Sequence, residues 1–244
     1  MTYLKPRWPR LILVTLLALI GAVGFGSLGT WQVHRLHWKL DLIARVDSRV
    51  HADPVPAPGP ADWSKINAAD YEYMRVTLRG TFLNGDEAQV YTPTDWGPGY
   101  WVLTPLRRDD GTVVFVNRGL VPEAMKAPAT RPAPEGEQTV TGLLRISETR
   151  GWLFSQPNEP AKDKWHLRDV GAIAAARGLT DVAPYFVDQE MVSPEAWPKG
   201  GQTVVKFRNA HLSYALTWYG LMLFVIGAWG YVAYTEFHRR PDEA

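Results

Sequence analysis

The sequence contains no cysteine among its 244 residues. This absence excludes disulfides, zinc sites built on thiolates, covalent attachment of c-type haem and copper delivery by thiols. Only five methionines are present. Because they are scattered, a methionine-rich copper site is not indicated. The net charge of +1 provides no field that would attract nucleic acid, so nucleic acid is not an expected partner.

Recognisable catalytic motifs are also missing. The sequence has no Gly-x-Ser-x-Gly, no phosphate-binding glycine loop and no His-Glu-x-x-His. The adjacent acids Asp109 and Asp110 lie in a predicted turn, where such residues are common for conformational reasons. His34 and His37 are three residues apart on a predicted helix and could share a metal, but no third ligand stands nearby. Anchoring at a membrane interface is the favoured interpretation of these two histidines.

Charge is missing from two long apolar runs, Leu11–Leu28 and Tyr214–Tyr234. With its helical continuation to Trp31, the first run is about 30 Å long, enough to cross a bilayer. Tyrosine and tryptophan lie towards the ends of the second run, as in the aromatic belts of membrane helices. The first run could also be the apolar part of a signal peptide, but its length and the lack of an Ala-x-Ala site favour an uncleaved anchor.

Two spans place both chain termini on the same side of the membrane. Basic residues flank both ends of the spans, and the basic N-terminal tail, which is free of acid, favours termini on the inside. Small residues recur along the spans and would let the two helices pair closely, although glycine is simply common in such helices and this explanation stays equally open. These residues are Ala18, Ala22, Gly26 and Thr30 in the first span and Gly220 and Gly227 in the second.

Between the spans, helical spacing continues past Trp31 until Asp53 and Pro54, and Pro54–Pro60 reads as a stiff polyproline linker. From Tyr73 the apolar pattern changes to the alternation typical of strands. The predicted strands are Tyr73–Phe82, Ala88–Tyr91, Tyr100–Leu106, Thr112–Asn117, Gln138–Ile146 and Tyr185–Asp188. One helix is predicted over Val170–Arg177, with Asp169 as its N-cap and Gly178 at its end.

The predicted fold class is therefore an integral membrane α+β protein, in which two transmembrane helices flank one β-rich domain with a short helix. The domain is either a small barrel or a sandwich. The predicted parts are an N-terminal tail (1–10), the first span (11–31), a helical extension (32–53), the β-rich domain (54–209, with the linker 54–60), the second span (210–234) and a C-terminal tail (235–244).

His211 stands at the mouth of the second span, where an ionisable residue is costly and often functional. At 100° per residue, His211, Trp218, Met222 and Trp229 lie within about 20° of one line along the helix. Such a stripe of imidazole, aromatic and thioether groups could form a wall for a flat apolar cofactor, and imidazole is a common axial ligand of haem iron. The alternative is that His211 only meets water among the lipid headgroups.

Three stretches together resemble the Surfeit locus protein family of cytochrome c oxidase assembly factors. The first is Gly29-Thr30-Trp31-Gln32 with Arg35, Trp38 and Lys39, and the second is Val116-Asn117-Arg118-Gly119-Leu120-Val121-Pro122. The third is Asn209-Ala210-His211-Leu212-Ser213-Tyr214-Ala215-Leu216-Thr217-Trp218. Their order and their distances from the two spans make the resemblance specific. One departure is Leu120, where the family usually has an aromatic residue.

The resemblance implies an assembly factor, not an enzyme, that helps to place haem a in subunit I of aa3-type oxidases. It implies that His211 is the axial ligand of the haem iron and that haem a is bound transiently as cargo. Tyr214 and Trp218 are expected to contact the haem, and Arg35 or Arg118 to pair with a propionate. For Arg35 the alternative is lipid phosphate binding, and for Arg118 it is a structural hydrogen bond.

The resemblance also implies a multi-pass protein of the inner membrane with its β-rich domain in the extracytoplasmic (periplasmic) space. The expected partners are subunit I, haem a synthase and the lipid bilayer. Two alternatives stay open at this point. One is a structural chaperone that docks on subunit I without binding haem, and the other is a membrane-anchored envelope enzyme.

Overall fold

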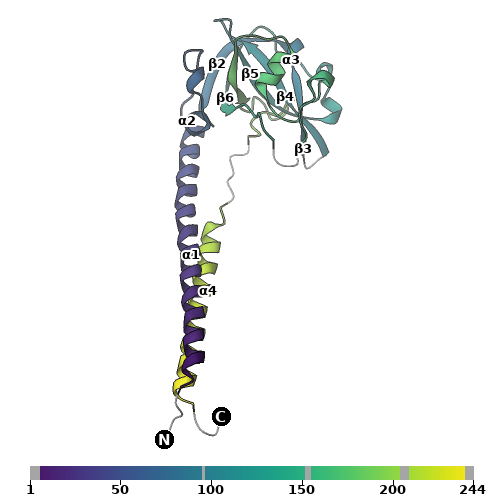
Figure 1. The fold of residues 1–244 in the computed structure, drawn as a ribbon. Coiled ribbons are helices and arrows are strands. Elements are labelled where there is room, and N and C mark those ends of the chain that lie inside the picture. The colour runs from purple at the N-terminus through teal and green to yellow at the C-terminus, as the bar shows by residue number, and fades with distance from the viewer. Residues whose placement is uncertain (1–5, 95–96, 152–154, 204–208, 240–244) are drawn as a thin grey trace. The chain divides into compact units, whose positions relative to one another are not determined.

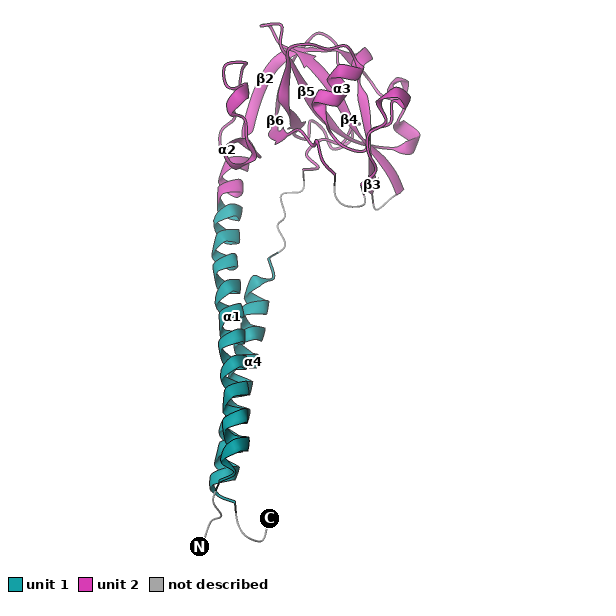
Figure 2. Ribbon diagram, viewed as in Figure 1, with its two compact units in different colours: residues 1–44, 206–244 teal, residues 45–205 magenta. Residues whose placement is uncertain are grey.

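The computed structural model describes residues 6–94, 97–151, 155–203 and 209–239. The chain divides into two compact units, coloured separately in Figure 2. Residues 1–44 and 206–244 form the first, which we call the helical unit, and residues 45–205 form the second, which we call the barrel unit. Each unit has its own construction and is described separately.

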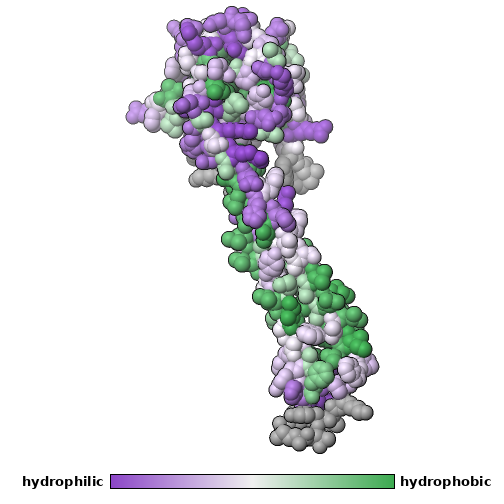
Figure 3. All heavy atoms as spheres, turned by 90° about the vertical axis from the view of Figure 1, so that its left-hand side faces the viewer, coloured by the Kyte–Doolittle hydropathy of each residue, from purple (hydrophilic) through white to green (hydrophobic). Residues whose placement is uncertain are grey.

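The helical unit consists of α1 (Trp8–Val50), whose last residues from Arg45 onward belong to the barrel unit, and α4 (His211–Phe237). The two helices lie antiparallel and side by side (Figure 1). Both are long and apolar enough to cross a membrane, and only 6% of the most apolar window of each helix is buried within the protein. Apolar side chains cover much of the exposed surface of the helices (Figure 3), as expected for a lipid environment.

Close helix contact depends on small residues of α1, as the sequence suggested. A Cβ atom at Gly29 would lie 2.8 Å from the ring of Tyr219, and one at Gly26 would lie 3.1 Å from the sulfur of Met222. The hydroxyls of Thr30 and Tyr219 are hydrogen-bonded at 3.1 Å. Gly220 and Gly227 of α4 have open space around them instead. The small residues of the first helix, and not the glycines of the second, therefore permit the pairing.

Near the chain termini, an ion pair joins the two helices. The guanidinium of Arg10 donates a hydrogen bond to the Glu236 carboxylate at 3.0 Å, and the Glu236 side chain is only 5% exposed. The Arg7 backbone N–H also donates to Glu236. Only the Glu236 side of this pair is buried, and loss of Arg10 would leave that carboxylate uncompensated, so the contact helps to fix the register of the helices.

Within its described residues, the barrel unit contains seven strands and two short α-helices, α2 (Ala68–Tyr71) and α3 (Val170–Ala176). Five strands, in the order β2-β6-β7-β5-β4, close on themselves because β2 also pairs with β4. The structure thus decides for a barrel over a sandwich. All six predicted strands are confirmed, most of them longer than predicted. The strands are β1 (Val55–Pro56), β2 (Arg75–Phe82), β3 (Ala88–Thr94), β4 (Gly97–Arg107), β5 (Val113–Pro122), β6 (Glu137–Ile146) and β7 (Val182–Gln189).

The barrel closes where β2 meets β4, through Thr81 opposite Arg107 and Phe82 opposite Leu106. The two strands approach so closely that a Cβ atom at Gly80 would lie 2.2 Å from the carbonyl oxygen of Arg107. Only glycine fits at this point. Closure leaves the barrel strands without a long free edge.

Two apolar clusters stabilise the barrel unit. One fills the barrel with inward side chains such as Val76, Leu144 and Val187. The other packs α3 and Trp165 against the opposite face of β5 and β7. The predicted N-cap of α3 is confirmed, since the Asp169 side chain accepts a hydrogen bond from the Ala172 backbone N–H at 3.1 Å.

The segment Pro54–Pro60, predicted as a stiff polyproline linker, instead joins the barrel. Val55 and Pro56 pair with β2 as a parallel edge strand, and Ala57 is buried. The Pro58 carbonyl accepts a hydrogen bond of 2.7 Å from the Tyr185 hydroxyl. Proline is tolerated at a sheet edge because no neighbouring strand requires its missing N–H. The predicted helical extension to residue 53 is also slightly long, because α1 ends at Val50.

Candidate functional site

His211 begins α4, and its side chain makes a polar contact with α1. Its ring Nδ1 lies 2.8 Å from the side-chain Oε1 of Gln32, across the helix pair. Gln32 is buried, with 9% of its surface exposed. Because an amide oxygen can only accept, Nδ1 of His211 donates in this contact, so in the neutral ring the lone pair is on Nε2. The ring is thereby held in one tautomer and one orientation.

Of the residues that follow His211 on α4, some contact α1 and others are exposed. Trp218 stacks on Phe25 of α1, with ring centroids 5.8 Å apart and an angle of 21° between the planes. Further along the same line, the indole N–H of Trp229 donates to the Thr15 hydroxyl at 2.9 Å. The predicted aromatic stripe therefore faces the partner helix, and Phe25 occupies one face of the Trp218 ring.

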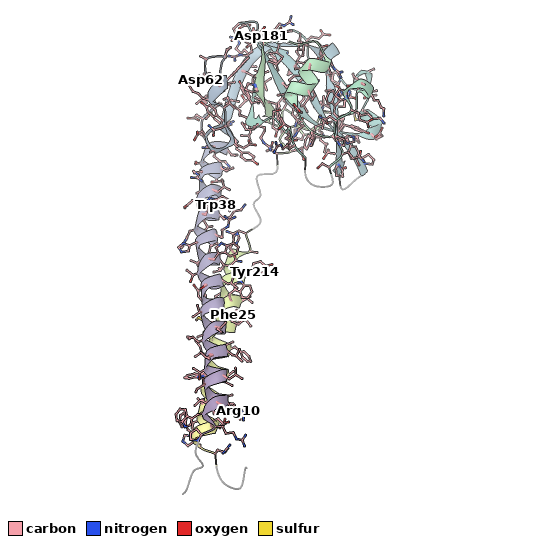
Figure 4. The ribbon with its side chains drawn as sticks, viewed as in Figure 1. Arg10, Phe25, Trp38, Asp62, Asp181 and Tyr214 are labelled. Carbon is pink, nitrogen blue, oxygen red and sulfur yellow. The ribbon has the colours of Figure 1, made fainter. Side chains whose placement is uncertain are left out.

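Tyr214 is 57% exposed, one helical turn from His211 (Figure 4). Its ring is thus accessible to a molecule bound beside the imidazole. Arg35 follows Gln32 by three residues, so the two are neighbours on the surface of α1. Its guanidinium lies 4.5 Å from the centroid of the exposed Trp38 ring. His211, Tyr214, Trp218 and Arg35 are therefore all parts of the helical unit, and the first three lie along two turns of α4.

Arg118, the other predicted propionate partner, belongs to the barrel unit. Its guanidinium lies 3.9 Å from the Glu87 carboxylate and over the ring of Phe82, at 5.6 Å from the centroid. It also donates a long hydrogen bond of 3.5 Å to the Pro132 carbonyl. These contacts favour a role within the barrel unit for Arg118, and its pairing with haem stays a prediction.

The other residues of the second motif have structural roles. The Asn117 amide donates to Asp188 at 2.7 Å, and its oxygen accepts from the Gly119 backbone N–H. Gly119 has φ of +127°, and a Cβ atom there would lie 2.2 Å from the Lys199 backbone. Leu120 exchanges two backbone hydrogen bonds with Lys199 and is buried despite not being aromatic. This motif is therefore explained by the construction of the barrel unit.

A buried ionic network surrounds Asp188 in the barrel unit. Arg145 donates to Asp188 at 3.0 Å and to Glu72 at 2.7 Å, while Arg168 bridges Asp188 and Glu148. Burial opposes ionisation of Glu148, but the hydrogen bond and positive charge of Arg168 outweigh this, and the pKa of Glu148 is lowered. Each carboxylate of the network already has a partner, which is typical of a structural network.

Two hollows run along the helix pair. One of about 590 Å³ extends over α1 from Ala22 to His34. The second, of about 350 Å³, shares Ala22 with the first and lies between both helices. Its lining is almost entirely apolar and consists of Thr15, Ala18, Leu19, Ala22, Ile226 and Trp229. The two hollows meet at Ala22, and the larger one also includes the polar residues Ser27, Thr30 and His34.

Sequence reasoning identified His211 but missed its partner Gln32 and the stacking residue Phe25. Gln32 was noticed only as part of a motif. A usable signal was present, because Phe25 and Gln32 are seven residues apart, as are His211 and Trp218. A shared seven-residue spacing places each pair on one face of its helix, so in an antiparallel pair the four residues can meet.

Comparison with known proteins agrees with this construction. A sequence model of the SURF1 family matches residues 19–223. Surfeit locus protein 1 of Homo sapiens is 39% identical over 225 residues, covering 84% of this chain and 72% of that protein. The Takifugu rubripes protein of the same name is 37% identical over 226 residues, covering 84% and 90%. A SURF1-like protein of Monosiga brevicollis is 36% identical over 227 residues, covering 86% and 83%.

The family match includes most of α1, residues 211–223 of α4 and the whole barrel unit. The relatives, in turn, are covered over most of their own length. This chain therefore belongs to the SURF1 family.

Proposed function

We propose that this protein is an assembly factor for aa3-type cytochrome c oxidase that binds haem a through His211 and assists its insertion into subunit I. Membership of the SURF1 family supports the assembly role. The observation that carries the haem proposal is the hydrogen bond between His211 and the buried Gln32. The protein acts on its cargo by binding and release, and not as an enzyme.

The Gln32 contact gives His211 the properties of an iron ligand. Histidines that bind metals usually donate their second ring N–H to a protein oxygen, which fixes the tautomer and raises the basicity of the ligating nitrogen. Here the Gln32 oxygen has that role, and Nε2 is the nitrogen that would bind haem iron.

The surroundings of His211 also fit haem a in its polar and apolar parts. Exposed Tyr214 provides an aromatic surface beside the imidazole, and Arg35 provides a guanidinium that matches a propionate carboxylate. Trp218 supports this arrangement from its stack on Phe25. A single axial imidazole makes the site weaker than one with two, which suits a protein that must release its haem.

The farnesyl tail of haem a would lie in the apolar hollows along the helices. Ala22, which lines both hollows, is ten residues from Gln32, a distance of about 15 Å along the helix axis. An extended farnesyl chain can cover this distance. Keeping the tail against apolar side chains avoids its exposure to water.

We further propose that the protein spans the inner membrane twice, with the barrel unit in the extracytoplasmic space and both termini in the cytoplasm. This orientation is supported by the basic N-terminal tail. His211 would then stand at the outer rim of the bilayer, where haem a from haem a synthase and the oxidase subunit I could reach it.

The proposal is tested by purifying the full chain in detergent from cells that make haem a and from cells that do not. Protein from the first host should show a haem a spectrum, and His211→Ala should be colourless. In the same cells, His211→Ala should lower the haem a content of the oxidase. Colourless wild-type protein, together with active oxidase in the His211→Ala cells, would instead identify a structural chaperone that does not bind haem.

A further inference from the structure

A pocket of about 250 Å³ lies on the barrel unit, at the end of β2 and next to the loop after β7. Phe82, Pro132, Pro134, Val192 and Trp197 provide much of its wall, and Arg118 also lines it. Ligand sites for small molecules usually measure about 300–1,000 Å³. This pocket is thus sized for one or two side chains and is too small for a porphyrin.

Arg118 is a nearly buried cation whose nearest carboxylate among the described residues is at the limit of ion-pair distance. Its side chain is only 11% exposed, and its nearest carboxylate, on Glu87, is 3.9 Å away. The hydrogen bond of 3.5 Å to the Pro132 carbonyl is at the limit of such contacts. Burial lowers the pKa of the Arg118 guanidinium, and the charge of Arg131 acts in the same direction. The guanidinium therefore stays poorly compensated by the protein itself.

Glu87 compensates Arg118 only in part, because its other carboxylate oxygen is bound by other residues. Its side chain is 6% exposed, and its Oε1 accepts hydrogen bonds from Arg131 and from the Gln89 amide. Arg131 is still more deeply buried, at 2% exposed, and donates to backbone carbonyls as well. Two guanidinium groups thus share one carboxylate, which leaves a surplus positive charge at the Arg118 side of the cluster.

A buried charge surplus is costly unless an anion completes it. Arg118 lines the pocket together with the polar residues Gln138, Thr139 and Gln189, and the rest of its wall is apolar and rich in proline. Val192 at its rim is 79% exposed, so an apolar side chain is presented to an incoming molecule. The chemistry that fits these features is a carboxylate flanked by apolar side chains. The planar fork of arginine binds such a carboxylate in a bidentate manner.

We propose that this pocket docks a partner protein through an acidic side chain set between apolar residues, with Arg118 as the receptor for the carboxylate. The surplus charge of the cluster and the apolar wall act together, because neither alone would select an acidic side chain set between apolar residues. The inference does not depend on haem binding. It can hold or fail whatever the outcome for His211.

The test uses the full chain in detergent and a fluorescein-labelled peptide, acetyl-Pro-Phe-Glu-Leu-Pro-amide, followed by fluorescence anisotropy. The matched peptide has glutamine in place of glutamate. The wild-type protein should bind the glutamate peptide at least tenfold more tightly than the glutamine peptide. Arg118→Gln should abolish this preference, because it removes the charge. Arg118→Lys should reduce it, because lysine keeps the charge but lacks the planar fork of arginine.

Two further variants test whether misfolding or a distant charge effect could explain the results with the Arg118 variants. Arg79→Gln removes an exposed arginine that pairs with Glu137, and it should leave the preference unchanged. Val192→Asp alters only an exposed rim residue and should weaken binding of the glutamate peptide by repulsion. Equal binding of the two peptides, a preference that survives in Arg118→Gln, or no saturable binding would overturn the proposal. The proposal would also be overturned if inorganic phosphate displaced the glutamate peptide at a concentration well below that at which acetate displaces it. Such a result would identify a phosphate site.

Discussion

The side-chain oxygen of Gln32 lies 2.8 Å from Nδ1 of His211, and this contact joins the two long helices at the residue that begins the second. It links a buried amide to an ionisable ring at the end of an apolar helix. The contact has two consequences, since it helps to hold the helices in register and also determines which ring nitrogen can bind a metal.

Replacing Gln32 should weaken haem a binding without removing the ligand. Gln32→Leu deprives Nδ1 of its acceptor, so the ring can rotate or change tautomer. Loss of such a supporting contact typically lowers metal affinity by about 10–100-fold. Titration of the purified protein with haem a measures the effect. The exposed imidazole of His37, removed in His37→Ala, is the matched control and should leave the affinity unchanged. Equal affinity of Gln32→Leu and wild type would contradict the assigned role.

Gly29 should be intolerant of even one added methyl group. A Cβ atom there would lie 2.8 Å from the Tyr219 ring, so Gly29→Ala must push the helices apart or displace the ring that bonds Thr30. Overpacking of this kind costs about 1–3 kcal/mol. Thermal unfolding in detergent should show a lower midpoint. Gly24→Ala, where an added Cβ meets nothing within 4 Å, should not lower it.

The contact between β2 and β4 that closes the barrel gives a similar prediction for the barrel unit. Gly80→Ala would place a Cβ atom 2.2 Å from a backbone oxygen of β4, which cannot move aside as a side chain can. We expect a loss of stability of at least about 1–3 kcal/mol, seen as faster proteolysis within the barrel unit. Gly85→Ala, five residues along the chain, has open space around the added atom and serves as the control. If Gly80→Ala were cleaved no faster than wild type, β2 and β4 would be less closely packed at this point than described.

Acid should destabilise the barrel unit through Glu148. Its pKa in the folded protein is below the ordinary value of 4.5, despite burial, because of Arg168. A lowered folded pKa contributes stability above the unfolded pKa, and this contribution is lost as the pH falls through the folded pKa. Glu148→Gln should therefore be less stable than wild type at pH 7, and the difference should shrink below about pH 4.5. Denaturant unfolding at several pH values measures this, and a difference independent of pH would contradict it.

The sequence predicted local structure well because alternation and apolar length are local signals. The six strands recognised from alternation are all present, and α3 begins after the predicted Asp169 cap. Barrel closure could not be predicted, because it depends on the approach of β2 to β4 at Gly80. The edge strand β1 was missed because its prolines resemble those of a linker, while its pairing depends on β2.

In the candidate site, too, the sequence predicted what depends on local signals and missed what depends on contacts between distant parts of the chain. His211 was recognisable as an ionisable residue entering an apolar helix. Its partner was not, because Gln32 is 179 residues away along the chain and only the pairing of α1 with α4 brings them together. Arg35 and Arg118 could not be separated by sequence. The structure assigns them to different units and gives Arg118 neighbours of its own in Glu87 and Phe82.

The most direct test of the account is a visible spectrum of the purified full chain with equimolar haem a, compared between wild type and His211→Gly. Wild type should give the bands of an imidazole-ligated haem a, His211→Gly should lose them, and added free imidazole should restore them in the variant. Identical spectra of the two proteins before imidazole is added would contradict the claim that His211 binds the iron.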